Sequence, residues 1–191
     1  KAVSNVNDLI KPKVFEKTFH DFREFDKFLI NLDGTDNKSK YGANAILSLS
    51  LAYYKAWSYV NYRAIFLSQG LENLTIPVPM LNVINGGQHA DNDVDFQEFM
   101  ILPIGFRSLT EALSSTHTVI SNIKKELKSR SLNTNLGDEG GFAPNLKSHL
   151  DVLDLICNSI SKAGFKLNDH FKISLDAASS EFYSDGKYNF E

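Results

Sequence analysis

Glu98 is the first side chain whose surroundings favour chemistry over simple solvation. It lies inside the apolar segment Phe96–Leu102, which a compact fold should bury on at least one face. Desolvating a carboxylate costs on the order of several kcal/mol unless a cation or hydrogen-bond donors compensate. Glu98 therefore needs a partner, unless it lies on the polar side of an edge strand, because Gln97 and Glu98 must point to opposite faces.

A glycine-rich pentapeptide, Gly137–Gly141, contains two adjacent acids, Asp138 and Glu139. Glycines let a ligand approach the backbone closely, and acids in different surroundings can hold different protonation states. A solvated loop of turn-forming residues explains the same pentapeptide equally well. Acid–base chemistry and an ordinary loop therefore both remain open for Glu139.

Asp176 and His89 each follow a segment with the character of a strand. Asp176 ends the apolar segment Lys172–Asp176, and the small residues Ala177–Ser180 leave room around its carboxylate. At the C-terminal end of a barrel strand such an acid is a typical metal ligand or catalytic group. A helix cap is an equally good explanation for Asp176 in isolation. His89 follows the turn Asn85–Gln88, and a lone loop histidine is usually just solvated.

Two familiar binding motifs are excluded by residues at fixed positions. The alternating acids of Asp91–Asp95 resemble the start of a calcium-binding loop, but Phe96 replaces its glycine and Leu102 its bidentate glutamate. The segment Gly34–Ser39 lacks the second glycine of a phosphate-binding P-loop. Neither a calcium loop nor a nucleotide loop is therefore expected.

Apolar periodicity predicts helices over the first seventy residues. Phe22–Leu29 carries aromatic and leucine side chains at helical spacing, and Ala43–Ala56 is a second, largely apolar stretch without proline. Strand-like segments begin only after these helices. We therefore predict a domain boundary near residues 70 to 77, between a first domain over 1–72 and a second over 77–191.

Three strands are predicted in the second domain. They are Ile76–Ile84, Asp95–Pro103 and Lys172–Asp176, and two helices lie between the second and the third. The order strand, strand, helix, helix, strand predicts an α/β fold.

The two helices carry recognisable start and stop signals. The first begins at Ser108, which forms a capping box with Glu111. The second begins near Ser148 and ends at Gly164. The predicted inner face of the first helix consists of Leu109, Leu113, Thr116, Ile120, Ile123 and Leu127. That of the second consists of Leu153, Ile156, Cys157 and Ile160, with Cys157 expected to be a small buried hydrophobe.

Composition narrows the classes of function. The chain has 191 residues, of which 42% are apolar and 23% charged, as in ordinary globular proteins. The net charge of -3, without basic blocks, argues against a nucleic-acid partner. We find no apolar run long enough for a membrane span and no signal peptide, and the single Cys157 fits a reducing, cytoplasmic setting. Because the chain opens at Lys1 and stops soon after a strand, we expect it to be cut from something longer.

Taken together, five segments resemble sequence blocks of the enolase family in the family's order. They are Leu32–Leu47, Asn82–Asn92, Phe96–Pro103, Gly137–Asn145 and Leu175–Phe182, and the resemblance runs over nearly the whole chain. The His-Ala-Asp-Asn sequence that starts at His89 and the short connection from Lys124 to Gly137 are more similar to bacterial enolases than to those of animals or fungi.

The resemblance implies a fold. In the family an N-terminal α+β domain precedes a C-terminal β/α barrel that begins strand, strand, helix, helix. Residues 1–72 would then be the helical part of the first domain, and residues 77–191 the incomplete opening of the barrel.

The resemblance also implies an activity, the reversible dehydration of 2-phospho-D-glycerate to phosphoenolpyruvate with Mg²⁺ as cofactor. By motif, His89 and the Gln97–Glu98 pair would contact the substrate, and Glu98 would also support the acid. Glu139 would be the general acid that helps hydroxide leave C3, and Asp176 one ligand of the tighter-bound magnesium. A lysine would remove the C2 proton, while two Mg²⁺ ions would stabilise the enolate.

Further parts of the family's site have no match in this chain. They are the lysine base, two more magnesium carboxylates, the phosphate-binding Arg and Ser, and an N-terminal serine loop that covers the site. We therefore expect this piece alone to be inactive and unstable, with open sheet edges. The resemblance further implies a homodimer and a cytoplasmic protein, with surface-exposed forms also known in the family.

Two other functions remain as alternatives. One is another enzyme of the enolase superfamily with a different carboxylate substrate, against which the block Gly137–Asn145 argues. The other is a non-catalytic surface protein that binds other proteins, and the sequence supplies no test of it.

Overall fold

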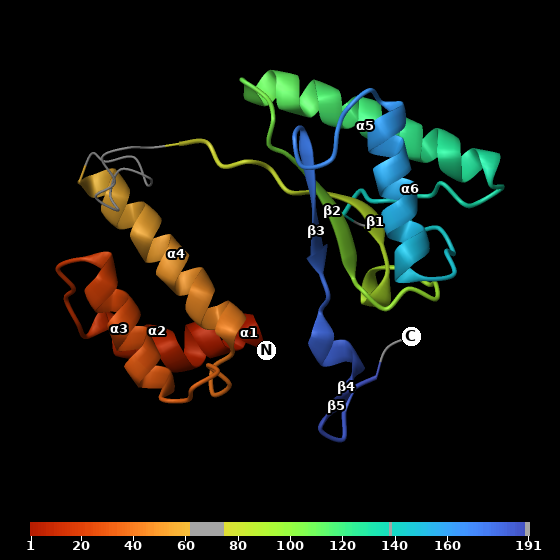
Figure 1. The fold of residues 1–191 in the computed structure, drawn as a ribbon. Helices are drawn as coiled ribbons and strands as arrows, with labels where there is room; N and C mark the ends of the chain where they lie inside the picture. Colours follow the sequence, from red (N-terminus) through yellow and green to blue (C-terminus); the bar gives the residue numbers. More distant parts are fainter. Residues whose placement is uncertain (62–74, 138, 190–191) are drawn as a thin grey trace. The chain divides into compact units, whose positions relative to one another are not determined.

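The computed structural model describes residues 1–61, 75–137 and 139–189 (Figure 1). The chain divides into two compact units, Lys1–Thr75 and Ile76–Glu191. Of the boundary region predicted at 70 to 77, residues 70–74 lie outside the described ranges.

The first unit is helical in its described part, as predicted. It contains α1 (Ala2–Ser4), a π-helical turn (Asn5–Ile10), α2 (Lys11–Phe15), α3 (Phe22–Asp33) and α4 (Ala43–Val60). Asp21 caps α3 by accepting a hydrogen bond from Glu24 N at 2.8 Å. The helix ends at Gly34, whose φ of 71° suits glycine. Apolar side chains of these elements form one small core, with Ile10 and Leu29 fully buried.

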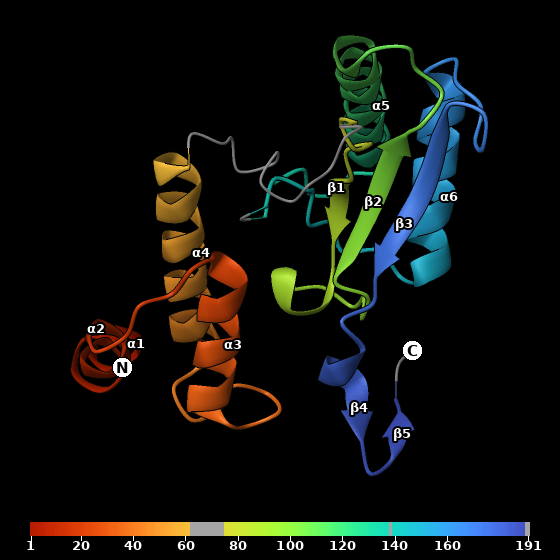
Figure 2. The same cartoon turned by 90° about the vertical axis from the view of Figure 1, so that its left-hand side faces the viewer.

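The second unit is built on a three-stranded sheet. Its strands are β1 (Leu81–Asn85), β2 (Glu98–Pro103) and β3 (Phe171–Asp176), in the order β1-β2-β3 with β2 antiparallel to both neighbours. The helices α5 (Leu109–Ser129) and α6 (His149–Lys162) pack against the sheet through a common apolar core, and Figure 2 shows both behind the strands. The predicted α/β order of strand, strand, helix, helix, strand is confirmed. Beyond β3 the chain forms a 3-10 turn (Ser179–Phe182) and a hairpin of β4 (Tyr183–Ser184) and β5 (Lys187–Tyr188).

Two predicted strands begin too early. The first was predicted from Ile76 but starts at Leu81, because Pro77 and Pro79 have no N–H to donate to a neighbouring strand. The second was predicted from Asp95 but starts at Glu98.

The predicted inner face of α5 is partly wrong. Its buried residues are Ala112, Thr116, Val119, Ile123 and Leu127. Leu109 and Leu113 are each 43% exposed, and Ile120 is only partly buried. Two adjacent stripes of this helix both repeat at helical spacing, so periodicity alone could not identify the one that faces the sheet.

The start of α5 confirms one half of the predicted capping box. Ser108 Oγ accepts from Glu111 N at 3.2 Å. The Glu111 carboxylate accepts from Arg107 N instead of from the N–H of Ser108. The N-terminus of α5 is therefore capped by Ser108, but the return bond to Glu111 comes from Arg107, one residue before the position that a capping box uses.

The predicted face of α6 is also displaced. Its buried residues are Val152, Leu155, Ile156, Ser159 and Ile160. Cys157 is half-buried rather than buried, although burial and the nearby Asp154 still raise the pKa of its thiol. The helix starts next to Ser148, as predicted, and Ser148 Oγ caps it by accepting from Asp151 N at 3.2 Å. Gly164 follows its end with φ +85°.

Candidate functional site

Three predicted site residues meet at one end of the sheet. His89 lies in a 3-10 turn after β1, Glu98 is the first residue of β2, and Glu139 lies in the glycine loop between α5 and α6. His89 Nδ1 is 3.4 Å from Glu98 Oε1 and 3.8 Å from Glu139 Oε2. One potential ligand atom of each side chain lies within 4.8 Å of those of the other two. Segments about fifty residues apart in sequence are thus brought together.

The turn between β1 and β2 places His89 beside the start of β2. Gly86 N donates to Gln97 O at 3.0 Å, and Gly87 N donates to Val94 O at 2.6 Å. A Cβ on Gly86 would lie 2.5 Å from the carbonyl oxygens of both Val94 and Phe96. Only glycine fits there, so this tight crossing depends on it.

The electrostatics of the site centre on Glu98, whose side chain is 15% exposed. The pKa of Glu98 is raised, first by a side-chain hydrogen bond with Glu139, then by burial and by the Glu139 charge. The charge of Asp176 raises it further, while His89 lowers it. A hydrogen bond between two carboxyl groups needs a proton on one of them. Glu98 can therefore hold a proton at a pH where an isolated glutamate has lost its own.

Asp176 lies beside this group without belonging to the three closest side chains. It is paired directly with Glu98 in the register of β2 and β3. Its carboxylate is exposed, and Oδ1 accepts from Ala178 N at 3.0 Å. This bond closes a local turn. The helix cap left open for Asp176 is not formed, because the following 3-10 turn (Ser179–Phe182) has Ala178 at its N-cap and no side-chain cap bond.

Gln97 connects the two neighbouring segments through its backbone. Its N–H donates to Asp176 O at 3.0 Å, and its carbonyl accepts from Gly86 N. Its side chain is half-buried.

The donor set fits a divalent cation. Three carboxylates, those of Glu98, Glu139 and Asp176, crowd one end of the sheet, and their mutual repulsion contributes to the raised pKa of Glu98. His89 Nδ1 is buried without a hydrogen-bond partner among the described residues. Carboxylate oxygens are the ligands that Mg²⁺ prefers, so Asp176 and its neighbours offer suitable chemistry.

One buried residue of the site was missed by the sequence reasoning. Asn85, at the end of β1, is 1% exposed and hydrogen-bonds the carbonyl of Gly141 in the glycine loop. Because Asn85 stands directly before Gly86 and Gly87, the sequence suggests a turn residue and gives no sign of its bond to the loop. Asp138, the other acid of the pentapeptide, lies outside the described residues.

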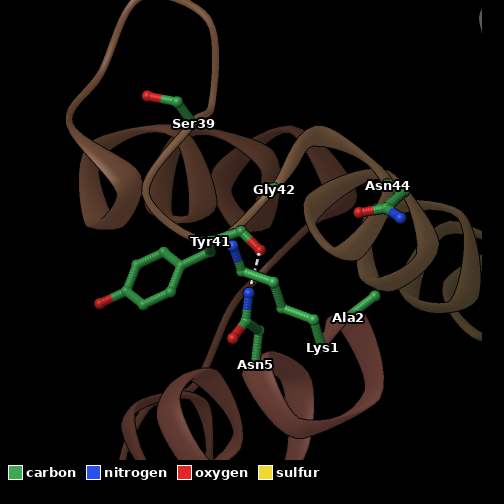
Figure 3. Close-up of a pocket in the computed structure, with 7 residues that line it drawn as sticks. All are labelled: Lys1, Ala2, Asn5, Ser39, Tyr41, Gly42 and Asn44. Carbon is green, nitrogen blue, oxygen red and sulfur yellow. Dashed lines mark hydrogen bonds between the residues drawn. The ribbon is translucent and has the colours of Figure 1, made fainter.

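A separate pocket lies in the first unit (Figure 3). It is lined by residues between Lys1 and Asn5 and between Ser39 and Asn44, and Asn5 Nδ2 donates to Tyr41 O there at 2.6 Å. None of the seven described residues that line it is acidic. It offers no acid–base pair comparable to Glu98 and Glu139.

None of the helices in the described ranges combines the length and apolar character that a membrane span requires.

Comparison with known families gives two matches that together cover the chain. The family described as "Enolase, N-terminal domain" matches residues 1–77. The family described as "Enolase, C-terminal TIM barrel domain" matches residues 73–191.

Proposed function

The chain belongs to the enolase family, and from this premise we propose that its protein catalyses the reversible dehydration of 2-phospho-D-glycerate to phosphoenolpyruvate. The family points to a lyase-type enzyme. The observation that carries the specific reaction is the raised pKa of Glu98 at the place where Glu98, Glu139 and His89 meet. A raised pKa at such a place suits a reaction in which a poor leaving group needs protonation.

The general acid in this proposal is Glu139. A base removes the proton from C2, the C3–O bond breaks, and the leaving hydroxide takes the proton of Glu139 and departs as water. Glu139 is the more exposed member of the pair, with 56% of its side chain accessible against 15% for Glu98. The accessible acid can reach a substrate, whereas the less exposed one is better placed to maintain its protonation.

Glu98 is then the supporting member of the pair. When Glu139 gives up its proton, the two carboxylates repel each other, and this repulsion favours proton return. His89 and Gln97 would contact the phosphoglycerate.

Asp176 would be a ligand of Mg²⁺. When bound, the cation supplies positive charge that stabilises the doubly charged enolate and offsets the crowding of carboxylates. The pairing of Glu98 with Asp176 across β2 and β3, and the raising effect of the Asp176 charge on the pKa of Glu98, support a cation at this place.

We propose that the remaining parts of the site lie on further segments of a longer protein. These are the base lysine, two further magnesium carboxylates, the phosphate-binding Arg and Ser, and the serine loop. We propose that residues 1–191 alone are inactive for this reason. We also propose a cytoplasmic homodimer of bacterial type, with residues 1–72 and 77–191 as parts of its two domains.

The proposal is tested with the full-length protein that contains this chain. Purified protein is incubated with 2-phosphoglycerate and Mg²⁺, and phosphoenolpyruvate is followed by its ultraviolet absorbance. We expect turnover that is abolished by a chelator and restored by Mg²⁺. A protein that dehydrates another hydroxy acid but leaves 2-phosphoglycerate unchanged would contradict the proposal and favour a different member of the superfamily.

A further inference from the structure

Asn85 ties the end of β1 to the loop that carries Glu139. Its side-chain Nδ2 donates to Gly141 O at 2.7 Å, and its Oδ1 accepts from Asn82 Nδ2 at 2.6 Å. Its backbone N–H donates to Phe142 O at 2.8 Å. Both the backbone and the side chain of this one residue therefore hold the C-terminal end of the glycine loop.

The loop closes on the same carbonyl group. Gly137 N donates to Gly141 O at 2.8 Å, and Gly140 N donates to Gly137 O at 3.0 Å. Gly141 O thus accepts from Gly137 N at one end of the loop and from Asn85 Nδ2 on β1. Glu139 lies midway between the two ends, so its backbone position depends on this junction.

The glycines at both ends of the loop leave room for the Asn85 amide. A Cβ on Gly137 would lie 2.6 Å from Asn85 Nδ2, and one on Gly141 would lie 3.0 Å from the same atom. By contrast, a Cβ on Gly140 would meet nothing within 4 Å. The loop is therefore packed tightly around the amide at its ends and is open near Glu139.

We propose that Asn85 is a positioning residue, whose buried amide fixes the loop Gly137–Gly141 so that Glu139 meets Glu98 and His89. Its effect on catalysis rests on the proposed function, but its effect on the loop does not. A buried amide is suited to this task because its bond to Gly141 O forms away from water and its other end is held by Asn82.

The substitution Asn85→Asp isolates the hydrogen bond from packing. It keeps the size of the side chain but places an oxygen against the carbonyl oxygen of Gly141. We expect turnover to fall by about 100-fold, the loss that a displacement of about 1 Å can cause at a reacting centre. Asn85→Ala removes the amide without adding a charge, and it should also lower turnover.

A double-mutant cycle with Glu139→Gln in the full-length protein tests whether the loss runs through Glu139. If Asn85 acts by positioning Glu139, Asn85→Ala should slow the wild-type protein but cause no further slowing in the Glu139→Gln background. Equal slowing in both backgrounds would overturn the proposal, because a general loss of structure lowers the turnover of both proteins alike.

Asn92→Ala is the matched control, since Asn92 donates to Asn85 O and Pro144 O and makes no bond to the loop. It should lower the melting temperature while turnover stays within about twofold.

Amide hydrogen exchange, measured by NMR, gives a readout that needs no activity. Asn85→Ala and Asn85→Asp should both speed exchange at Gly137 N, while Asn92→Ala should not. If the wild-type protein fails to dehydrate 2-phosphoglycerate, the proposed function fails, yet faster exchange at Gly137 N still supports the role of Asn85. Unchanged exchange at Gly137 N in both Asn85 variants would overturn that role.

Discussion

The substitution Glu139→Gln in the full-length protein is the most direct test of how the acid pair works. It keeps the shape of the side chain but removes the proton that can be transferred. In place of a shared proton, the new amide can only donate a hydrogen bond to Glu98. Turnover should therefore fall while the affinity for Mg²⁺, which we assign to Asp176, stays unchanged.

The size of the loss follows from the general-acid role. Positioned acids contribute about 10²- to 10⁴-fold, or roughly 3 to 5 kcal/mol of activation free energy. We therefore expect turnover to fall by a factor within that range, about 10²- to 10⁴-fold.

The assay combines kinetics with a titration of Glu98. The rate of phosphoenolpyruvate formation gives the loss in turnover, and ¹³C NMR of the Glu98 carboxyl reports its pKa. The pKa should move down towards its ordinary value in Glu139→Gln, because the hydrogen bond and charge of Glu139 are the first and third causes of its rise. Asp154→Asn, the same chemical change on α6, should alter neither quantity. Dehydration at near wild-type rate in Glu139→Gln would remove Glu139 from the acid role, and an unchanged Glu98 titration would refute the pairing.

Three further predictions concern stability, measured by denaturant unfolding of the full-length protein. Phe171→Ala should lower the free energy of unfolding by about 3 to 5 kcal/mol, because Phe171 is fully buried. Leu167→Ala, at a half-exposed position, is the control, and a smaller loss for Phe171→Ala than for this control would contradict the place of Phe171 in the core. Ser148→Ala should cost about 1 kcal/mol through loss of the α6 cap, and Ser148→Asp, which restores an acceptor, should recover most of it. Burial raises the pKa of Asp33. Hydrogen bonds from the Thr35 hydroxyl and from the N–H groups of Tyr41 and Thr35, together with the charge of Lys38, lower this pKa by more, so the net shift is downward. Its contribution is present above the ordinary pKa and is lost as pH falls through the lowered folded value; Asp33→Asn should remove this acid-dependent part, and an identical acid limb in both proteins would refute it.

Much of the fold could be predicted because its signals are local. Ser108 and Ser148 mark the starts of α5 and α6, and Gly34 and Gly164 mark where helices end. The stripe of α5 that faces the core could not be predicted, since that choice depends on the shape of the sheet it packs against. Leu109 and Leu113 therefore look like core residues in sequence and are partly exposed in the structure.

At the candidate site, too, single residues could be identified from their own segment, but their partners on other segments could not. Glu98 was identified because an acid in an apolar segment needs a partner, and the structure brings Glu139 and His89 to it. No property of Glu98 in sequence specifies those partners, which lie on other segments; the family resemblance supplied them. Asn85 was missed because the acceptor of its amide, Gly141 O, is 56 residues away and becomes adjacent only when the loop folds back on β1.

The register of the sheet also bears on how the chain is made in the cell. Glu98 on β2 pairs with Asp176 on β3, so the partner strand leaves the ribosome only after nearly eighty more residues have been translated. At about 5 to 20 residues per second, the β1–β2 pair waits on the order of 4 to 16 s with one edge of β2 unpaired. During this interval we expect nascent chains to expose an unpaired strand edge, which can pair with other chains until β3 covers it.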